Sequence, residues 1–409
     1  MLGLEKIQKL KIQFDGNDAL VFAVAAVLLV LPYSESLKNI FLGLTLLVFV
    51  YCYFKKSGVR FGFCAIFCLL WIVSLVVGNL LSDNPNILSV NDELKIILFA
   101  IVVSSIPWTK NYLRVCIVAC AVGVLFAIVT GAYDYFILQK TPYWQLKSVG
   151  HVNQSSIYVL EALCVIFPYA MLKGSDLKPA QKILTWTALI AVFVYLVFGE
   201  SRATFAGMVL VTATILAFDR DVIRKNYKRT FVILCAIAVS LLVFYWLFGS
   251  IRFVEKQIEV SQTNNLFTGR LEIWKSALRY VASHNLFFGI GQNHFMDVPI
   301  VGTYFEHISH GHNSIVHRMT EGGLWGVVWY VAFLCLVLFY LIKHIVATNG
   351  LIRISPIYIV WQMAVLMMII LIFVGCFNTT MRYEHGLLAA FVLGVFCSFE
   401  RRLKRSLEI

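Results

Sequence analysis

Long apolar stretches separated by short polar segments recur along almost the whole chain. A helix needs about 20 apolar residues to cross roughly 30 Å of hydrocarbon, and the stretches predict twelve such spans. They lie at 18–32, 36–54, 62–81, 91–107, 111–136, 153–172, 182–198, 203–218, 230–249, 323–342, 357–377 and 386–400. Strands of a porin-type barrel would instead alternate apolar and polar residues. The pattern therefore predicts an all-α polytopic membrane protein.

The longest polar segment, residues 250–322, interrupts this series and divides the chain into three parts. Residues 1–249 hold spans one to nine, and residues 323–409 hold the last three spans and a basic tail. Within the polar segment, Thr268 is a candidate N-cap for a helix whose apolar positions include Leu271, Trp274, Leu278 and Val281. A second helix is expected from residue 309 to 319. The segment then forms a small helical cap on the membrane surface.

Composition supports the same class of protein. Hydrophobic residues make up 60% of the chain and charged residues 14%, whereas soluble domains are about 45–50% apolar and about 25% charged. A net charge of +12 would suggest nucleic acid for a soluble protein, but we attribute it to cytoplasmic loops and expect no nucleic-acid partner. The ten cysteines fall within apolar segments, so we interpret them as small buried hydrophobes.

Lysine and arginine gather in alternate short connections. They are Lys6, Lys9, Lys11, Lys55, Lys56, Arg60, Lys110, Arg114, Lys173, Lys178, Lys182, Arg220, Arg224, Lys225, Lys228, Arg229, Lys343, Arg353, Arg401, Arg402, Lys404 and Arg405. The positive-inside rule places this set in the cytoplasm, together with both termini. The connections near 82–91, 137–152, 199–202, 250–322 and 378–385 then lie on the outer face.

Arg202 lies in a short turn between two predicted spans, on the outer face. An arginine at a membrane boundary can simply extend its charge to water. Three features favour anion binding instead: the shortness of the turn, Glu200 nearby to orient the guanidinium, and the positive N-terminal end of the next helix. A guanidinium suits bidentate phosphate binding.

Arg270 begins the expected helix of the polar segment, next to Gly269. The alternative is a solvated arginine or an ion pair with Glu272. Lys275 and Arg279 follow on the same helix, but their spacing does not place them in one stripe with Arg270. The position at the helix N-terminus makes Arg270 the preferred anion ligand of the three.

Four histidines, His307, His310, His312 and His317, end the polar segment. Histidine is the side chain that titrates near neutral pH unaided, which suits a general base; a structural role is the alternative for each. A metal site would need three or four ligands, and this face offers no cysteine and no typical carboxylate spacing, so we expect no metal. We favour His312 as the base, because on a helix it would share a face with residues 315, 316 and 319 and point toward the membrane.

Several short motifs in this region resemble those of the O-antigen ligase and Wzy polymerase superfamily. They are Ser201-Arg202-Ala203-Thr204, Gly269-Arg270-Leu271-Glu272-Ile273-Trp274, Gly289-Ile290-Gly291 with Phe295, His312-Asn313-Ser314, and Glu321-Gly322-Gly323-Leu324-Trp325-Gly326. Each motif alone has low specificity. The resemblance lies in their order and in their common placement on the outer face. The remaining spans are similar to the family only in number and hydropathy.

The resemblance implies a GT-C-like glycosyltransferase with a helical periplasmic cap, in the bacterial inner membrane. Arg202 and Arg270 would hold the diphosphate of an undecaprenyl-linked glycan donor, and His312 would act on the acceptor hydroxyl. We assign substrate binding to His310, Arg382, Gln154, Asn313 and Glu321. The expected reaction moves O-antigen polysaccharide to a sugar hydroxyl of lipid A–core with inversion, and it needs no metal or other cofactor. Membrane lipids are the remaining expected partners.

Two alternatives within the same superfamily remain open, an O-antigen polymerase and a protein O-oligosaccharyltransferase. The chain length and the absence of an added outer domain after the last span favour the ligase. A transporter of the same lipid-linked glycan is a further alternative, and it would carry charges at mid-membrane. Glu161 is the main such charge. Because the other polar candidates gather on the outer face, we favour an enzyme.

Overall fold

The computed structural model describes residues 16–55, 59–141, 143–173, 177–199, 201–218, 269–300, 308–347 and 356–407, with a few single residues between 235 and 246. Within these ranges the chain forms helices and no strand. The long helices are α2 (Gly16–Val30), α3 (Glu35–Phe54), α4 (Phe63–Leu80), α5 (Asn91–Ser105), α6 (Lys110–Ala132), α7 (Val152–Lys173), α8 (Pro179–Phe198), α9 (Arg202–Phe218), α13 (Arg270–Ser283), α14 (Ser314–Ala347), α15 (Pro356–Phe373) and α16 (Tyr383–Leu407). Short helical turns are η1 (Ile87–Val90), η2 (Tyr133–Ile137), η3 (Phe295–Asp297) and η4 (Val374–Cys376).

The all-α polytopic class is confirmed. Seven of the described helices are long and apolar enough to cross a membrane, namely α3, α4, α6 with the π-helical turn η2, α7, α8, α14 and α15. Helices α2, α9 and α16 are apolar but have shorter apolar stretches, and α5 has only 15 residues with Asp92 and Glu93 in its first turn. The ninth predicted span, 230–249, lies almost wholly outside the described residues, so the count of twelve stays a prediction.

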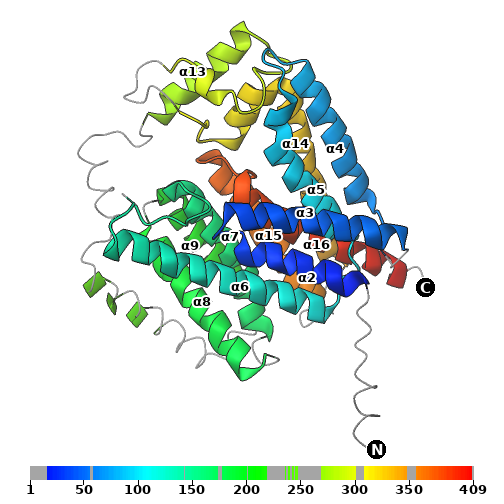
Figure 1. Cartoon of the computed structure of the whole chain (residues 1–409), viewed down its shortest axis with the longest axis vertical. Coiled ribbons are helices and arrows are strands. Elements are labelled where there is room, and N and C mark those ends of the chain that lie inside the picture. The colour runs from blue at the N-terminus through cyan, green and yellow to red at the C-terminus, as the bar shows by residue number, and fades with distance from the viewer. Residues whose placement is uncertain are drawn as a thin grey trace, which may run out of the picture.

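Helix α7 lies at the centre of the bundle, where it contacts α6, α8, α9, α15 and α16 and is buried along most of its length. Helix α16 packs along α5, and α2 packs between α3 and α6 across one face of the molecule (Figure 1). Several of these helices begin at a side-chain cap: Ser34 accepts the Leu37 N–H (3.4 Å) and Thr109 accepts the Tyr112 N–H (3.2 Å). These caps fix the first residues of α3 and α6.

Helix α13 lies at one end of the molecule, away from the bundle centre (Figure 1). It buries Ile273, Ala277 and Val281. Ile273 and Ala277 belong to a small separate core formed with residues 290, 295, 298, 308 and 316. The expected apolar face was wrong in part, because Leu271 and Leu278 are exposed. Gly269, in the left-handed region with φ 77°, takes the N-cap position, while Thr268 lies outside the described residues.

The second cap helix also differs from the expectation. It begins at Ser314 and continues into the next span as one element, α14, with non-helical geometry at Gly323 (φ 61°, ψ −161°). The kink arises where the loop after α13 passes close by. Leu324 N–H donates to Leu286 O and Trp325 N–H donates to Phe287 O, both at 3.0 Å. A side chain at Gly323 would collide with the backbone of Phe287.

Candidate active site

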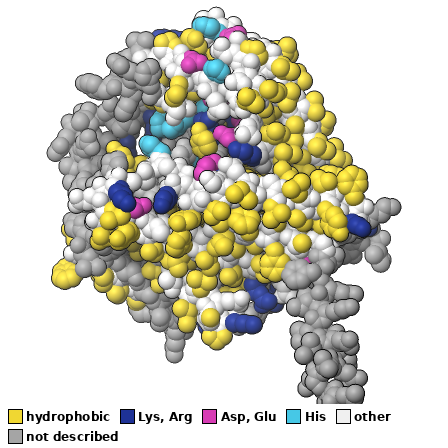
Figure 2. All heavy atoms as spheres, in the orientation of Figure 1, with side chains coloured by type: hydrophobic (Ala, Val, Ile, Leu, Met, Phe, Trp, Pro, Cys, Tyr) yellow, Lys and Arg dark blue, Asp and Glu magenta, His cyan; other side chains and the backbone are white. Residues whose placement is uncertain are grey.

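Histidine, basic and acidic side chains gather in a hollow between the end that carries α13 and the helices below it (Figure 2). The hollow is open at the protein surface, between the cap that contains α13 and the helical bundle (Figure 2). The candidate residues reach it from α9, α13, the start of α14 and the start of α16. Segments more than a hundred residues apart in the sequence therefore meet at one place.

The two arginines named by the sequence lie close together. Arg202 is the first residue of α9 and Arg270 the first residue of α13, so each sits at the positive end of a helix. Burial and then the Arg202 charge lower the pKa of Arg270. Among the residues that the structure describes, neither guanidinium makes an ion pair; Glu200, expected to orient Arg202, lies outside them. Two neighbouring cations at helix N-termini form a site for an anion of more than one charge.

His312 lies beside this pair, but not on a helix. Its backbone is in the left-handed region (φ 48°), two residues before α14 begins. The expected helical face with residues 315, 316 and 319 therefore does not apply. Burial, and secondly the charge of Arg270, lower the pKa of His312 to about 4. The imidazole is thus neutral at pH 7, the form that can accept a proton, and its Nδ1 has no hydrogen-bond partner among the described residues.

The loop around His312 is held in place by its neighbours. Asn313 Oδ1 accepts the N–H groups of Ile315 (2.9 Å) and Val316 (3.0 Å), and Asn313 Nδ2 donates to Cys376 O (3.0 Å). Ser314 Oγ accepts the Thr380 N–H at 2.9 Å. These bonds join the start of α14 to the loop before α16. Asn313, predicted to bind substrate, thus uses its amide to cap α14, which positions His312.

His310 completes a row of rings. Its centroid lies 4.4 Å from that of His312 and 6.2 Å from that of His151. Burial, followed by the charges of His312, His317 and Arg382, holds the pKa of His310 well below its usual range. His310 Nδ1 lies 3.0 Å from Ser309 Oγ, while Nε2 is buried without a partner among the described residues. Neutral rings with open nitrogens suit recognition of hydroxyl groups.

Glu321, on the first turns of α14, belongs to a buried charged network. His317 Nε2 lies 3.3 Å from Glu321 Oε2, and Arg318 forms an ion pair with Glu93 of α5. With its amide nitrogen turned toward the acids, Gln292 donates to both carboxylates at 3.2 Å. The network ties the loop after α13 to α5 and α14. It was not predicted from sequence, since its members are spread over more than two hundred residues.

Arg382 lies between this network and the histidines. Arg382 Nη2 donates to Asn293 Oδ1 (2.8 Å), and its guanidinium stacks over the Tyr383 ring at 4.8 Å. Its side chain lines a small polar pocket with Glu93, Glu321 and Gln292 among others. The carboxylates nearby offset part of its charge, so Arg382 is less free to bind phosphate than Arg202 or Arg270.

Gln154 lies at the outer end of α7 and contacts a second buried cluster. Gln154 Oε1 lies 2.6 Å from His385 Nε2. The adjacent Glu384 is paired with Lys38 of α3 at 2.5 Å and accepts from Ser148 at 3.2 Å. Lys38, Glu384 and His385 were not among the predicted site residues. The signal was present, because a lysine inside a predicted apolar span and a Glu-His pair before the last span are both unusual in lipid.

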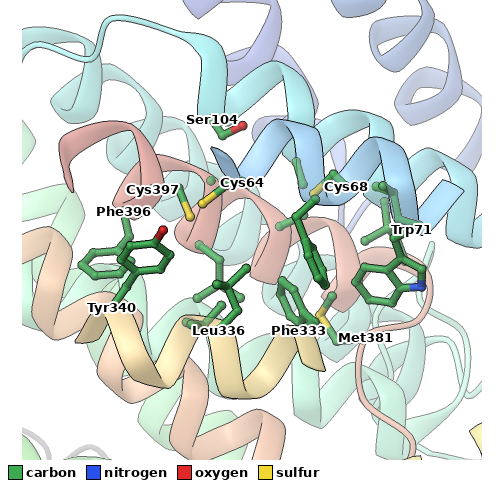
Figure 3. A pocket seen from close by; sticks show the side chains of 18 residues that line it. Cys64, Cys68, Trp71, Ser104, Phe333, Leu336, Tyr340, Met381, Phe396 and Cys397 are labelled. Atoms are coloured by element: carbon green, nitrogen blue, oxygen red, sulfur yellow. The ribbon is translucent and has the colours of Figure 1, made fainter. Parts of the chain in front are cut away.

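A separate apolar pocket lies between α4, α5, α14 and α16 (Figure 3). Cys64, Cys68 and Trp71 of α4 face Phe333 and Tyr340 of α14 across it. No charged side chain lines this pocket, so it lacks the groups that a transfer reaction needs. The described residues also contain no cluster of three or more potential metal ligands.

The fold and this cluster define a polytopic membrane protein with a cationic, histidine-containing site between its cap and its helical bundle. Residues 187–331 match a family model described as O-Antigen ligase, and that segment contains Arg202, Arg270 and His312. This match supports membership of the O-antigen ligase and Wzy family and a function of the ligase or polymerase type. Comparison with curated protein sequences finds no match.

Proposed function

We propose that the protein is an O-antigen ligase. It transfers a glycan from undecaprenyl diphosphate to a sugar hydroxyl of lipid A–core at the periplasmic face of the bacterial inner membrane, with both termini in the cytoplasm. The observation that carries the proposal is the Arg202–Arg270 couple, which makes no ion pair among the described residues, beside a neutral His312. This is a site for a diphosphate next to a proton acceptor.

The diphosphate is bound by the two guanidiniums. A leaving undecaprenyl diphosphate gains negative charge as its bond to the sugar breaks, so fixed cations that face it stabilise the transition state more than the ground state. Arginine does this in bidentate geometry without a divalent cation. Each such donor typically contributes about 10²–10³ in rate.

His312 is the proposed general base. The acceptor hydroxyl oxygen attacks the anomeric carbon from the side opposite the diphosphate and forms the new glycosidic bond. The bond from that carbon to the phosphate oxygen breaks, its electron pair leaves with undecaprenyl diphosphate, and the hydroxyl proton passes to His312. The anomeric centre is inverted. Base assistance of this kind contributes roughly 10²–10⁴ in rate.

Binding of the glycan donor also raises the basicity of His312. The positive charge of Arg270 is one cause of the low pKa of His312. A bound diphosphate offsets that charge, so the pKa of His312 rises toward its usual range. The base thus gains proton affinity only when the donor is in place.

The test is transfer by purified protein in detergent, with undecaprenyl-diphosphate glycan, lipid A–core and excess EDTA. We expect glycosylated lipid A–core from the wild type. Arg202→Ala and Arg270→Ala should each lower the rate by about 10²–10³. Arg279→Ala is the matched control, because Arg279 is exposed on the same helix as Arg270, and it should keep the wild-type rate.

Other products would decide against the ligase. Lengthened donor with unmodified lipid A–core would mean a polymerase, and a glycosylated protein acceptor would mean an oligosaccharyltransferase. Transfer that stops with EDTA would contradict the metal-independent step. Equal losses in Arg202→Ala and Arg279→Ala would show that the assay reports general damage rather than loss of a diphosphate contact.

A further inference from the structure

Glu161 is a buried carboxylic acid at the middle of α7 that the transfer reaction does not use. Its side chain is 0% exposed, and neither carboxylate oxygen has a hydrogen-bond partner among the described residues. The residue lies more than two turns from the outer end of the helix. An ionised carboxylate in such a place is strongly disfavoured, so the group is held as the neutral acid, with one O–H donor to satisfy.

Glu161 belongs to a polar stripe that descends from the candidate site. Gln154, Tyr158 and Glu161 are spaced by four and three residues, which puts them on one face of α7. All three are nearly or fully buried. The Tyr158 hydroxyl, like Glu161, has no partner within the described part of the chain.

The outer end of the stripe offers a complementary acceptor. His385 of α16 donates through Nε2 to Gln154 Oε1 (2.6 Å), which leaves its buried Nδ1 as a free acceptor in the neutral ring. Helices α7 and α16 pack against each other. Glu384, which pairs with Lys38, is the residue next to His385 on α16.

The inner end offers a further acceptor. Pro168 lies inside α7 and has no N–H, so the carbonyl of residue 164, four positions earlier, lacks its helical donor. This carbonyl is one turn below Glu161. The stripe therefore runs from the His385 nitrogen, which has no partner among the described residues, past a hydroxyl and an acid, to a carbonyl that lacks its helical donor.

Unpartnered buried donors and acceptors are costly, and ordered water usually satisfies them when two or more lie within reach of one molecule. We propose that Gln154, Tyr158 and Glu161, together with His385, line an internal water site that joins a protonated acid at mid-membrane to the outer face. Its ligand is water, and the exchangeable proton on Glu161 is in contact with outer solvent through it. Chains of acids, histidines and water serve proton movement in membrane proteins. The site does not depend on the transfer reaction.

Infrared difference spectroscopy tests the site directly. The infrared spectrum of the wild-type protein minus that of Glu161→Gln should show the carbonyl stretch of a protonated carboxylic acid at neutral pH. Transfer to D2O should shift that band promptly, because water reaches the acid. Glu161→Asp keeps a carboxylic acid at this position, so it should shift the frequency of the band without removing it. This shift assigns the band to residue 161 even if Glu161→Gln folds poorly. Glu272→Gln, on the cap, is the matched control and should remove no acid band.

A shift in D2O that is prompt in the wild type and slowed in Tyr158→Phe supports the site, since that variant removes one hydroxyl from the stripe. Absence of an acid band would mean an ionised Glu161 and overturn the proposal. A band that does not shift in D2O would mean an acid sealed from water and would overturn it equally.

Discussion

His312 owes its properties to its position between a helix end and an arginine. The positive φ at His312 and the Asn313 cap turn the residue away from the α14 axis. Burial and Arg270 together keep the ring neutral. A free histidine would be partly protonated near pH 6.5, and a protonated ring cannot act as a base. In the proposed mechanism the same arginine binds the anion and keeps His312 neutral in the absence of substrate.

The coupling between these two residues gives a prediction in the absence of substrate. A positive neighbour lowers the pKa of an imidazole, so removing that neighbour raises it. We expect the pKa of His312 to rise from about 4 in Arg270→Gln. Nuclear magnetic resonance titration of labelled histidine would measure the change. Arg279→Gln should leave His312 unchanged, and an unaltered pKa in Arg270→Gln would show that the arginine does not act on the ring.

Helix α14 is bent where the cap loop meets it. Gly323 has φ 61° and Gly289 has φ 75°, and a side chain on either would meet the backbone of the other segment. Ile290 N–H donates to Thr320 O at 2.9 Å across the same contact. The two glycines thus allow two backbones to touch, and this contact sets the cap over the bundle.

Adjacent glycines provide a matched pair for testing this contact. Gly323→Ala places a side chain at a positive φ, which alone costs about 1–3 kcal/mol, and also against the Phe287 backbone. Gly322→Ala meets nothing closer than 3.7 Å and removes the entropy cost of a helical glycine. We expect thermal unfolding at lower temperature for Gly323→Ala only. Similar unfolding of both variants would refute the close-contact role.

At the scale of the whole molecule, charge decides the orientation. Basic residues concentrate in one set of loops and in the tail with Arg401, Arg402, Lys404 and Arg405. The candidate site lies with the opposite set, near Arg202, Arg270 and Arg382. The positive-inside rule therefore predicts that the site lies on one side of the membrane and the basic loops on the other.

Reporter fusions would test this orientation. Green fluorescent protein joined after residue 409 should fluoresce, because the tail is expected in the cytoplasm. Alkaline phosphatase joined after residue 300 should be active, because the cap is expected outside. A fusion of alkaline phosphatase after Lys56, in a basic loop, should be inactive. The reversed pattern would place the site in the cytoplasm and exclude a periplasmic ligase.

The sequence by itself determined the class of protein, because apolar length and loop charge are local properties that depend on the solvent rather than on tertiary packing. It also indicated Arg202, as a charge in a short turn between two spans, and Arg270 and His312, as a helix-start arginine and a titratable histidine in the one long polar segment. Only the tertiary structure decided which groups meet. The couple of Arg202 with Arg270, the pairs Lys38–Glu384 and Arg318–Glu93, and the helical face that α13 buries all depend on contacts between distant segments. Such contacts follow from how the described apolar helices share one interior, and a linear pattern of hydropathy does not contain that choice.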